Sequence, residues 1–245
     1  MTNSLRTFCI LLAFVIGSIS STPTYAADTV KETIVKSDSG VLLKIRMEGP
    51  YTADVPLQVV CYFKYSAAGV QKMKGAPVEL DKHLNGVIGA LRERGEFVGN
   101  RLETILINAP KDSIKAGHLL LIGLGSEDEL SLELMEQVGA TALRTAASLG
   151  LKRVAFAPLL RDQGNDKLAT GAVETAVVRG ALLAYDTQSR MHKQQLANSY
   201  TLEEWWIEAG PAYYDETVAG VEKAVAETSK AIKTRLSTPY ATKKN

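Results

Sequence analysis

The chain has 245 residues, of which 46% are hydrophobic and 22% charged, values typical of a globular protein and unlike those of a disordered or fibrous one. Lys and Arg number 28 against 27 Asp and Glu, so a formal charge of +1 gives no reason to expect a nucleic-acid partner. The 2 cysteines are too few for a disulfide scaffold or a cysteine-rich metal site.

Residues 1–26 have the order of a secretory signal peptide. One cation, Arg6, precedes the apolar run 8–16, and small residues lead to a cleavage site after Ala26. A membrane anchor is the alternative, but the run is well short of the ~20 residues that cross a bilayer. Cleavage leaves Cys61, whose strand-like surroundings favour a buried, inert thiol. The sequence therefore predicts a periplasmic or secreted protein with no membrane contact after cleavage.

Strand and helix patterns alternate beyond an N-terminal extension at 27–40. Strand patterns cover 41–47, 57–63, 103–108, 119–122, 153–157 and 201–209. Helix patterns cover 80–94, 131–149, 167–185 and 215–236, with loops at 65–77 and 186–199 and a tail at 237–245. This alternation predicts one α/β domain over 41–236, with a mixed or mostly parallel sheet and helices on both faces.

One turn between a strand and a helix is a candidate ligand site. Gly123, Leu124, Gly125 and Ser126 follow an apolar strand, where backbone N–H groups often bind a phosphate. The third glycine of the dinucleotide fingerprint is missing, and the acidic residues 127–129 follow directly. A tight turn with a solvated acidic helix start is therefore the favoured interpretation, and a ligand site at these four residues is the alternative.

Other chemistry-bearing residues stand alone. The histidines His83, His118 and His192 have no metal-ligand spacing around them, so the sequence predicts no metal site. Trp205 and Trp206 point to opposite faces if they lie on a strand. One is then expected in the core, and the other at an interface or beneath a covering helix.

Four segments carry a family pattern in one order. They are the helix and turn 80–100, the strand and turn 119–125, the segment 150–154 after an alanine-rich helix, and the helix 174–185. By order and spacing they resemble the N-terminal domain of the leucyl aminopeptidase (cytosol aminopeptidase) family, and the resemblance covers roughly residues 41–236.

The resemblance implies a macro-domain-like, three-layer α/β fold. In the family, the metals and the catalytic Lys and Arg belong to a C-terminal domain marked by Asn-Thr-Asp-Ala-Glu-Gly-Arg, which has no counterpart in this sequence. The matching positions therefore imply no catalytic residue, metal ligand or cofactor. We expect an exported domain acting in binding or assembly, with itself or a separate catalytic aminopeptidase chain as partner. The alternatives are the non-catalytic part of a split metallo-aminopeptidase and a binder of ADP-ribose or a related nucleotide.

Overall fold

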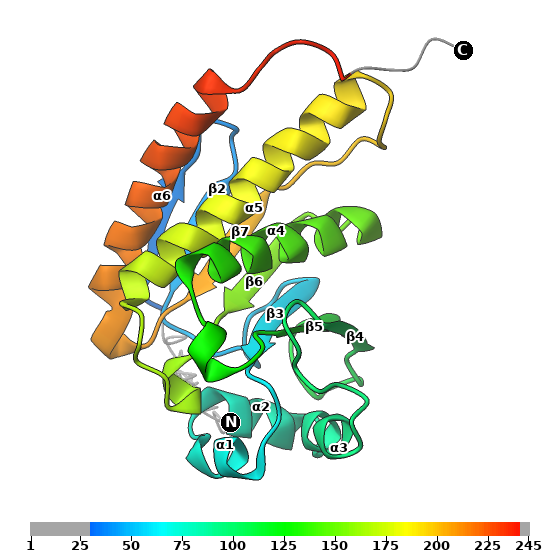
Figure 1. Ribbon diagram of the computed structural model, residues 1–245, viewed down its shortest axis with the longest axis vertical. Coiled ribbons are helices and arrows are strands. Elements are labelled where there is room, and N and C mark those ends of the chain that lie inside the picture. The colour runs from blue at the N-terminus through cyan, green and yellow to red at the C-terminus, as the bar shows by residue number, and fades with distance from the viewer. Residues whose placement is uncertain (1–29, 241–245) are drawn as a thin grey trace, which may run out of the picture.

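A computed structural model describes residues 30–240, which form a seven-stranded mixed sheet (Figure 1). The strands are β1 (Glu32–Lys36), β2 (Leu42–Arg46), β3 (Leu57–Tyr62), β4 (Thr104–Asn108), β5 (His118–Gly123), β6 (Arg153–Ala157) and β7 (Glu204–Glu208). Their spatial order is β1-β2-β7-β6-β3-β5-β4. The inner strands β2, β7, β6, β3 and β5 are parallel, and the edge strands β1 and β4 are antiparallel to their neighbours. The carboxyl ends of the parallel strands therefore meet at one edge of the sheet.

Helices cover both faces of the sheet, which confirms the expected three-layer α/β fold. They are α1 (Ala67–Lys72), α2 (Ala76–His83), α3 (Val87–Glu93), α4 (Leu132–Leu149), α5 (Thr170–Lys193) and α6 (Tyr214–Thr234). In Figure 1, α4, α5 and α6 lie together over one face. On the other face, α2 and α3 pack against β3 and β5.

The central strand β3 shows why the sequence forms a sheet interior. All six of its residues are buried, because both of its faces are covered. Val59 and Cys61 face the α4–α6 layer, and Val60 and Tyr62 face α2 and α3. Burial raises the pKa of the Cys61 thiol far above its ordinary value, so the expectation of a buried thiol is confirmed.

The α4–α6 layer is held by unusually close helix contacts. A Cβ added at Gly180 of α5 would lie 1.9 Å from the Glu136 carbonyl oxygen of α4. A Cβ at Gly220 of α6 would lie 2.3 Å from the Gly171 carbonyl oxygen of α5. Because glycine has no side chain, the helix backbones touch at these two positions, and any larger residue would force them apart.

Sequence patterns gave the bounds of α4 well and those of α2 and α3 poorly. The Ser131 side chain caps α4 by accepting the Leu134 N–H (3.2 Å), as predicted. The single helix predicted over 80–94 is wrong: it is broken at Asn85 and Gly86, whose φ angles are 54° and 80°. The carboxylate of Asp81 then accepts the amide hydrogens at the start of α3.

Three further segments differ from the predicted elements. Helix α1 lies within the predicted loop 65–77, and strand β1 lies within the extension 27–40. The predicted loop 186–199 is wrong in its first half, because α5 continues to Lys193. There Asp186 pairs with Arg190 and Arg235, both at 2.7 Å, so these polar side chains stabilise a helical surface.

The predicted signal peptide, residues 1–26, lies outside the described residues. Among residues 30–240, no helix has the length and apolarity needed to cross a bilayer.

Candidate functional site

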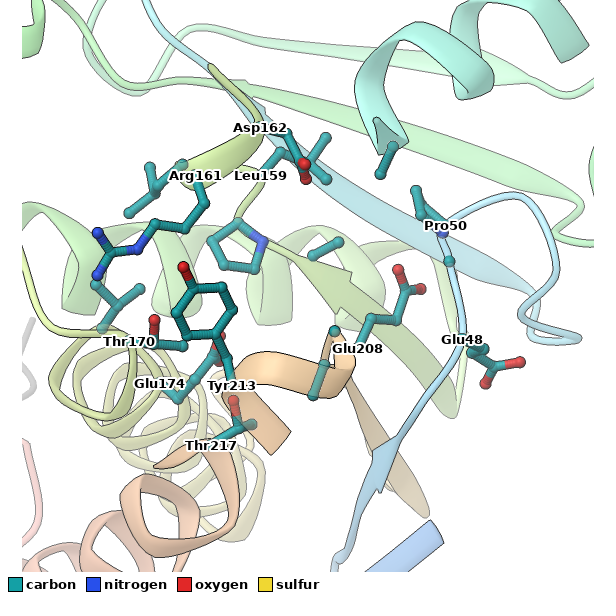
Figure 2. Close-up of a pocket in the computed structure, with 18 of the residues that line it drawn as sticks. Glu48, Pro50, Leu159, Arg161, Asp162, Thr170, Glu174, Glu208, Tyr213 and Thr217 are labelled. Carbon is teal, nitrogen blue, oxygen red and sulfur yellow. The ribbon is translucent and has the colours of Figure 1, made fainter. Parts of the chain in front are cut away.

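A cavity of about 300 Å³ lies at the carboxyl ends of β2, β6 and β7. Its walls come from the segments that follow these strands, residues 48–50, 157–162 and 208–210, and from the start of α5 (Figure 2). Ligands of open α/β sheets bind at this edge, where loops leave the strands in different directions. The position and volume therefore make this cavity the first candidate for a small-molecule site.

Most of the lining is apolar. Its hydrophobic members are Pro50, Ala76, Ala157, Pro158, Leu159, Leu160, Leu168, Val173 and Ala209. The loop after β6 is held in place by Gln163, which accepts the Phe63 N–H (3.0 Å) and donates to the Cys61 carbonyl (2.9 Å). This wall is thus tied to the end of β3.

Glu208, the last residue of β7, brings a carboxyl into the cavity. It follows the apolar residues 205–207 and is 9% exposed. Neither of its carboxyl oxygens has a hydrogen-bond partner among residues 30–240. Burial raises the pKa of Glu208 well above its ordinary value, more than the nearby Gln58 amide lowers it, and the carboxyls of Glu48 and Glu174 raise it further. Glu208 is therefore a buried acid whose surroundings disfavour its charged form.

Glu174 supplies a second buried carboxyl from α5. Its side chain is 1% exposed, and its Oε2 atom has no hydrogen-bond partner within the described part of the chain. Burial raises its pKa to about 8. Figure 2 shows Glu208 projecting between the strand ends and the Pro50 segment, with Glu174 extending from α5 behind the Tyr213 ring.

The remaining charged groups of the lining are engaged or lie at its margin. Glu48 points away in Figure 2 and pairs with Arg46. Arg161 donates to the Leu168 carbonyl (2.9 Å). Burial raises the pKa of Asp162, which is partly exposed. Four carboxyls and one guanidinium thus surround the cavity.

The turn at residues 123–126 lies elsewhere on the same edge, after β5. Its four amide hydrogens are accepted by the carbonyl oxygens of Glu103, Tyr62 and Gly99 and by the Glu129 carboxylate, at 2.7, 2.9, 2.9 and 3.0 Å. The Ser126 hydroxyl also donates to Glu129 (2.9 Å), and these hydrogen bonds lower the pKa of that carboxyl. Because all four N–H groups are engaged within the chain, a phosphate would have to displace them, and a ligand site here stays a prediction.

Both tryptophans of β7 are buried. Trp205 is 1% exposed and stacks on Phe156 at 6.0 Å between ring centroids, inside the α4–α6 layer. Trp206 is 7% exposed on the opposite face and lies beneath Arg46, whose guanidinium is 4.3 Å from its ring centroid. The two faces are as expected, and contact of either ring with a partner stays a prediction.

The three histidines make different contacts in the structure. His83 stacks on Tyr51 (4.7 Å between centroids), and His118 and His192 each lie 3.2 Å from a backbone carbonyl oxygen. Within residues 30–240, no three His, Cys, Asp or Glu side chains are arranged to hold a metal ion.

Sequence reasoning missed the two buried carboxyls of the cavity. The available signal was weak: Glu208 ends the run Trp-Trp-Ile-Glu, and Glu174 stands among apolar neighbours in the helix 170–193. An isolated acid in an apolar run is compatible with a solvent-facing position, and the burial of both depends on segments distant in sequence.

The fold is shared with two kinds of solved structure. A tomato leucine aminopeptidase variant aligns over 79% of this chain and 36% of its own, with a TM-score of 0.54 at 17% identity. A macrodomain variant from Oceanobacillus iheyensis aligns over 83% of this chain and 98% of its own, with a TM-score of 0.52 at 10% identity. At these identities the likeness concerns the fold alone, and it defines a macrodomain-like α/β domain.

Sequence comparison gives the family. Residues 59–195 match the family described as cytosol aminopeptidase family, N-terminal domain. A probable cytosol aminopeptidase of Geotalea uraniireducens is 30% identical over 189 residues, which are 75% of this chain and 35% of the relative. One of Ralstonia nicotianae is 33% identical over 107 residues, 44% of this chain and 21% of the relative. The chain belongs to the cytosol aminopeptidase family, matches its N-terminal domain, and spans about a third of its first relative.

Proposed function

We propose that the chain is an exported domain of the cytosol aminopeptidase family that acts by binding a small molecule rather than by hydrolysing peptides. The observation that carries this proposal is the cavity at the carboxyl ends of β2, β6 and β7, into which Glu174 and Glu208 bring buried carboxyls without partners. Burying a polar group without a partner costs about 1–3 kcal/mol of stability. A ligand that supplies the missing partners would offset that cost, which is why such groups mark binding sites.

Two further observations support binding. The family match, over residues 59–195, is to the N-terminal domain. The cavity is largely apolar with a few buried polar groups, the usual composition of a site that recognises a small molecule.

Binding is tested by nuclear magnetic resonance of the isotope-labelled protein with a mixture of small neutral, cationic and anionic fragments. We expect shifts to cluster at the backbone amides of the cavity lining, such as Val173 and Gly210. Ala157→Leu, which adds volume at the cavity lining, should weaken these shifts, whereas Glu222→Gln, at an exposed position on α6 outside the lining, should leave them unchanged. If no fragment of any charge moves the lining amides, the binding proposal fails.

The absence of peptidase action is a separate part of the proposal. We expect the purified protein to leave leucine p-nitroanilide intact in the presence of Mn²⁺ or Zn²⁺. Metal-dependent release of p-nitroaniline, co-eluting with the protein, would overturn this part and leave the cavity's ligand to be considered as a substrate or effector.

Export and assembly complete the proposal. Residues 1–26 support export by their order of charged, apolar and small residues. We expect the protein in the periplasmic or secreted fraction with Ala27 as its first residue, which N-terminal sequencing tests. Co-purification from the native host tests whether a second copy or a separate aminopeptidase chain is its partner.

A further inference from the structure

We propose that the ligand of this cavity is an organic ammonium ion with a small apolar body, paired through its nitrogen with the carboxyls of Glu174 and Glu208. This inference rests on the proposed binding function and names its ligand class. It draws on three features of the cavity: its charge, its apolar walls and the protonation state of its two acids.

The charge of the lining is unbalanced. Within the described residues, the one cation of the lining is Arg161, which is directed to the Leu168 carbonyl. Arg46 lies nearby but pairs with Glu48 and with Glu32 on β1. Glu174 and Glu208 are therefore left without a counter-charge, and a cationic ligand would supply it in a poorly solvated site, where charge pairing is strong.

The walls select an organic cation. Prolines, leucines, valine and alanines form most of the surface, and burying alkyl groups against them is favourable at about 25 cal/mol per Å² of apolar area. A bare metal ion would leave that surface unused, and residues 30–240 hold no group of three ligating side chains. A volume of about 300 Å³ suits an alkylammonium of about five to eight carbons.

Protonation adds a distinctive signature. Burial raises the pKa of Glu174 to about 8, so this carboxyl is mostly protonated in the empty cavity near pH 7, and burial also raises the pKa of Glu208 well above its ordinary value. An ammonium ion favours their ionised forms, so binding releases a proton, and affinity rises as the pH rises from about 6 to about 9. The other titratable or charged groups that face the pair are Glu48 with its partner Arg46, Cys61 on β3, Arg161 and Asp162 after β6, and Tyr213 before α6.

The test is calorimetry of the purified protein with four probes of one chain length: pentylammonium, pentyltrimethylammonium, pentan-1-ol and pentanoate. We expect both cations to bind at least about tenfold more tightly than the alcohol, and pentanoate to bind least, because only the cations pair with the carboxyls. The quaternary probe does not titrate, so its affinity should rise with pH, and heats in buffers of different ionisation enthalpy should report proton release.

Variants locate the effect. Glu174→Gln and Glu208→Gln keep the shape of the side chain and remove its charge. Each should lower the affinity for pentyltrimethylammonium by about tenfold or more and make that affinity less dependent on pH. The affinity for pentan-1-ol should not change. Glu222→Gln, at an exposed position on α6, is the matched control and should change neither probe. Retained binding of the alcohol shows that the glutamine variants are folded.

The outcomes separate the two proposals. If pentan-1-ol binds as tightly as the cations, or affinity falls as pH rises, the acids act as neutral hydrogen-bond donors and this inference is overturned, while the binding function stands. If none of the four probes binds, and the fragment mixture also causes no chemical-shift change at the amides of the cavity lining, both proposals are wrong.

Discussion

Two regions lie at the same edge of the sheet: the cavity containing Glu174 and Glu208, and the turn at residues 123–126. They differ in whether their polar groups have hydrogen-bond partners within the chain. In the turn, every amide hydrogen has an acceptor within the chain. In the cavity, two buried carboxyls lack partners among the described residues. Glycines after a strand therefore mark close packing here, and the unpartnered acids mark the candidate site.

The packing of the turn depends on what Gly123 lacks. A Cβ at this position would lie 2.0 Å from the Asn100 carbonyl oxygen, so the backbone at residues 99–100 occupies the space that a side chain would need. Close approach of another segment of the chain, rather than of a ligand, explains this glycine.

The largest expected loss of stability comes from a substitution in the turn, compared with a substitution at the cavity margin. Gly123→Ala should lower the free energy of unfolding by about 3 kcal/mol, because residues 99–100 must move to admit the new methyl group. Gly210→Ala, at the cavity margin, should change it by less than about 0.5 kcal/mol, since its φ of −68° suits alanine and its Cβ site is open. Urea unfolding followed by tryptophan fluorescence measures both, and similar losses would contradict the comparison.

The next prediction concerns the cavity, and it is a change in the pH dependence of stability caused by Glu174. The pKa of Glu174 is about 8 in the folded protein and close to 4.5 when unfolded, so the folded state holds the proton more tightly. The contribution of Glu174 to stability is then fully present below about pH 4.5 and is lost as the pH rises from about 4.5 to about 8. Glu174→Gln removes this loss, and its stability relative to wild type should increase by about 4 kcal/mol between pH 5 and pH 9.

The control for that prediction is Glu222→Gln, an exposed carboxyl on α6. Its stability should follow the wild-type curve within about 0.5 kcal/mol across the same pH range. Parallel curves for Glu174→Gln and wild type would show that the Glu174 carboxyl is solvated, and the cavity would lose its distinguishing feature.

A smaller effect, on the pKa of Glu129, tests whether the polar groups of the turn are hydrogen-bonded within the chain. Ser126→Ala removes the hydroxyl that donates to Glu129, so the pKa of Glu129 should rise part of the way to its ordinary value, with the Ser126 N–H bond retained. Carboxyl carbon chemical shifts across a pH titration measure it. Ser131→Ala, which removes the cap of α4 and no carboxylate contact, should leave the pKa of Glu129 unchanged.

The last prediction is that ADP-ribose does not bind. ADP-ribose should give no saturable heat with this protein, because the turn has its amide hydrogens engaged and the cavity is lined by carboxyls. Gly125→Glu serves as the matched variant. Heat that saturates in the wild type and disappears in Gly125→Glu would make the turn a phosphate site and reverse the comparison.

Local sequence was enough to predict elements whose signals are local. Helix α4 was predicted almost to the residue, because Ser131 and Gly150 mark its ends and its apolar residues have helical spacing. The break between α2 and α3 was missed, since the left-handed Asn85 and the cap from Asp81 depend on conformation rather than on hydrophobic period. The all-parallel interior of the sheet agrees with the strand–helix alternation.

The candidate site could not be predicted in the same way. Glu208 is desolvated by the segment 48–50 from β2 and by residues after β6, about 160 and 50 positions away in sequence. The motif that sequence did offer, at residues 123–126, is conspicuous because it is local. Burial of a lone acid is a property of the tertiary structure, and only the assembled strand ends reveal it.

The glycine contacts among α4, α5 and α6 also bear on how fast a ligand would come and go. With Gly180 against Glu136 and Gly220 against Gly171, α5 cannot tilt without separating touching backbones, so the wall that carries Glu174 is stationary. Gln163 fixes the loop after β6 in the same way. Tyr213 is an exposed part of the lining, at 38%, so the residence time of a bound molecule should depend on how fast its ring moves aside.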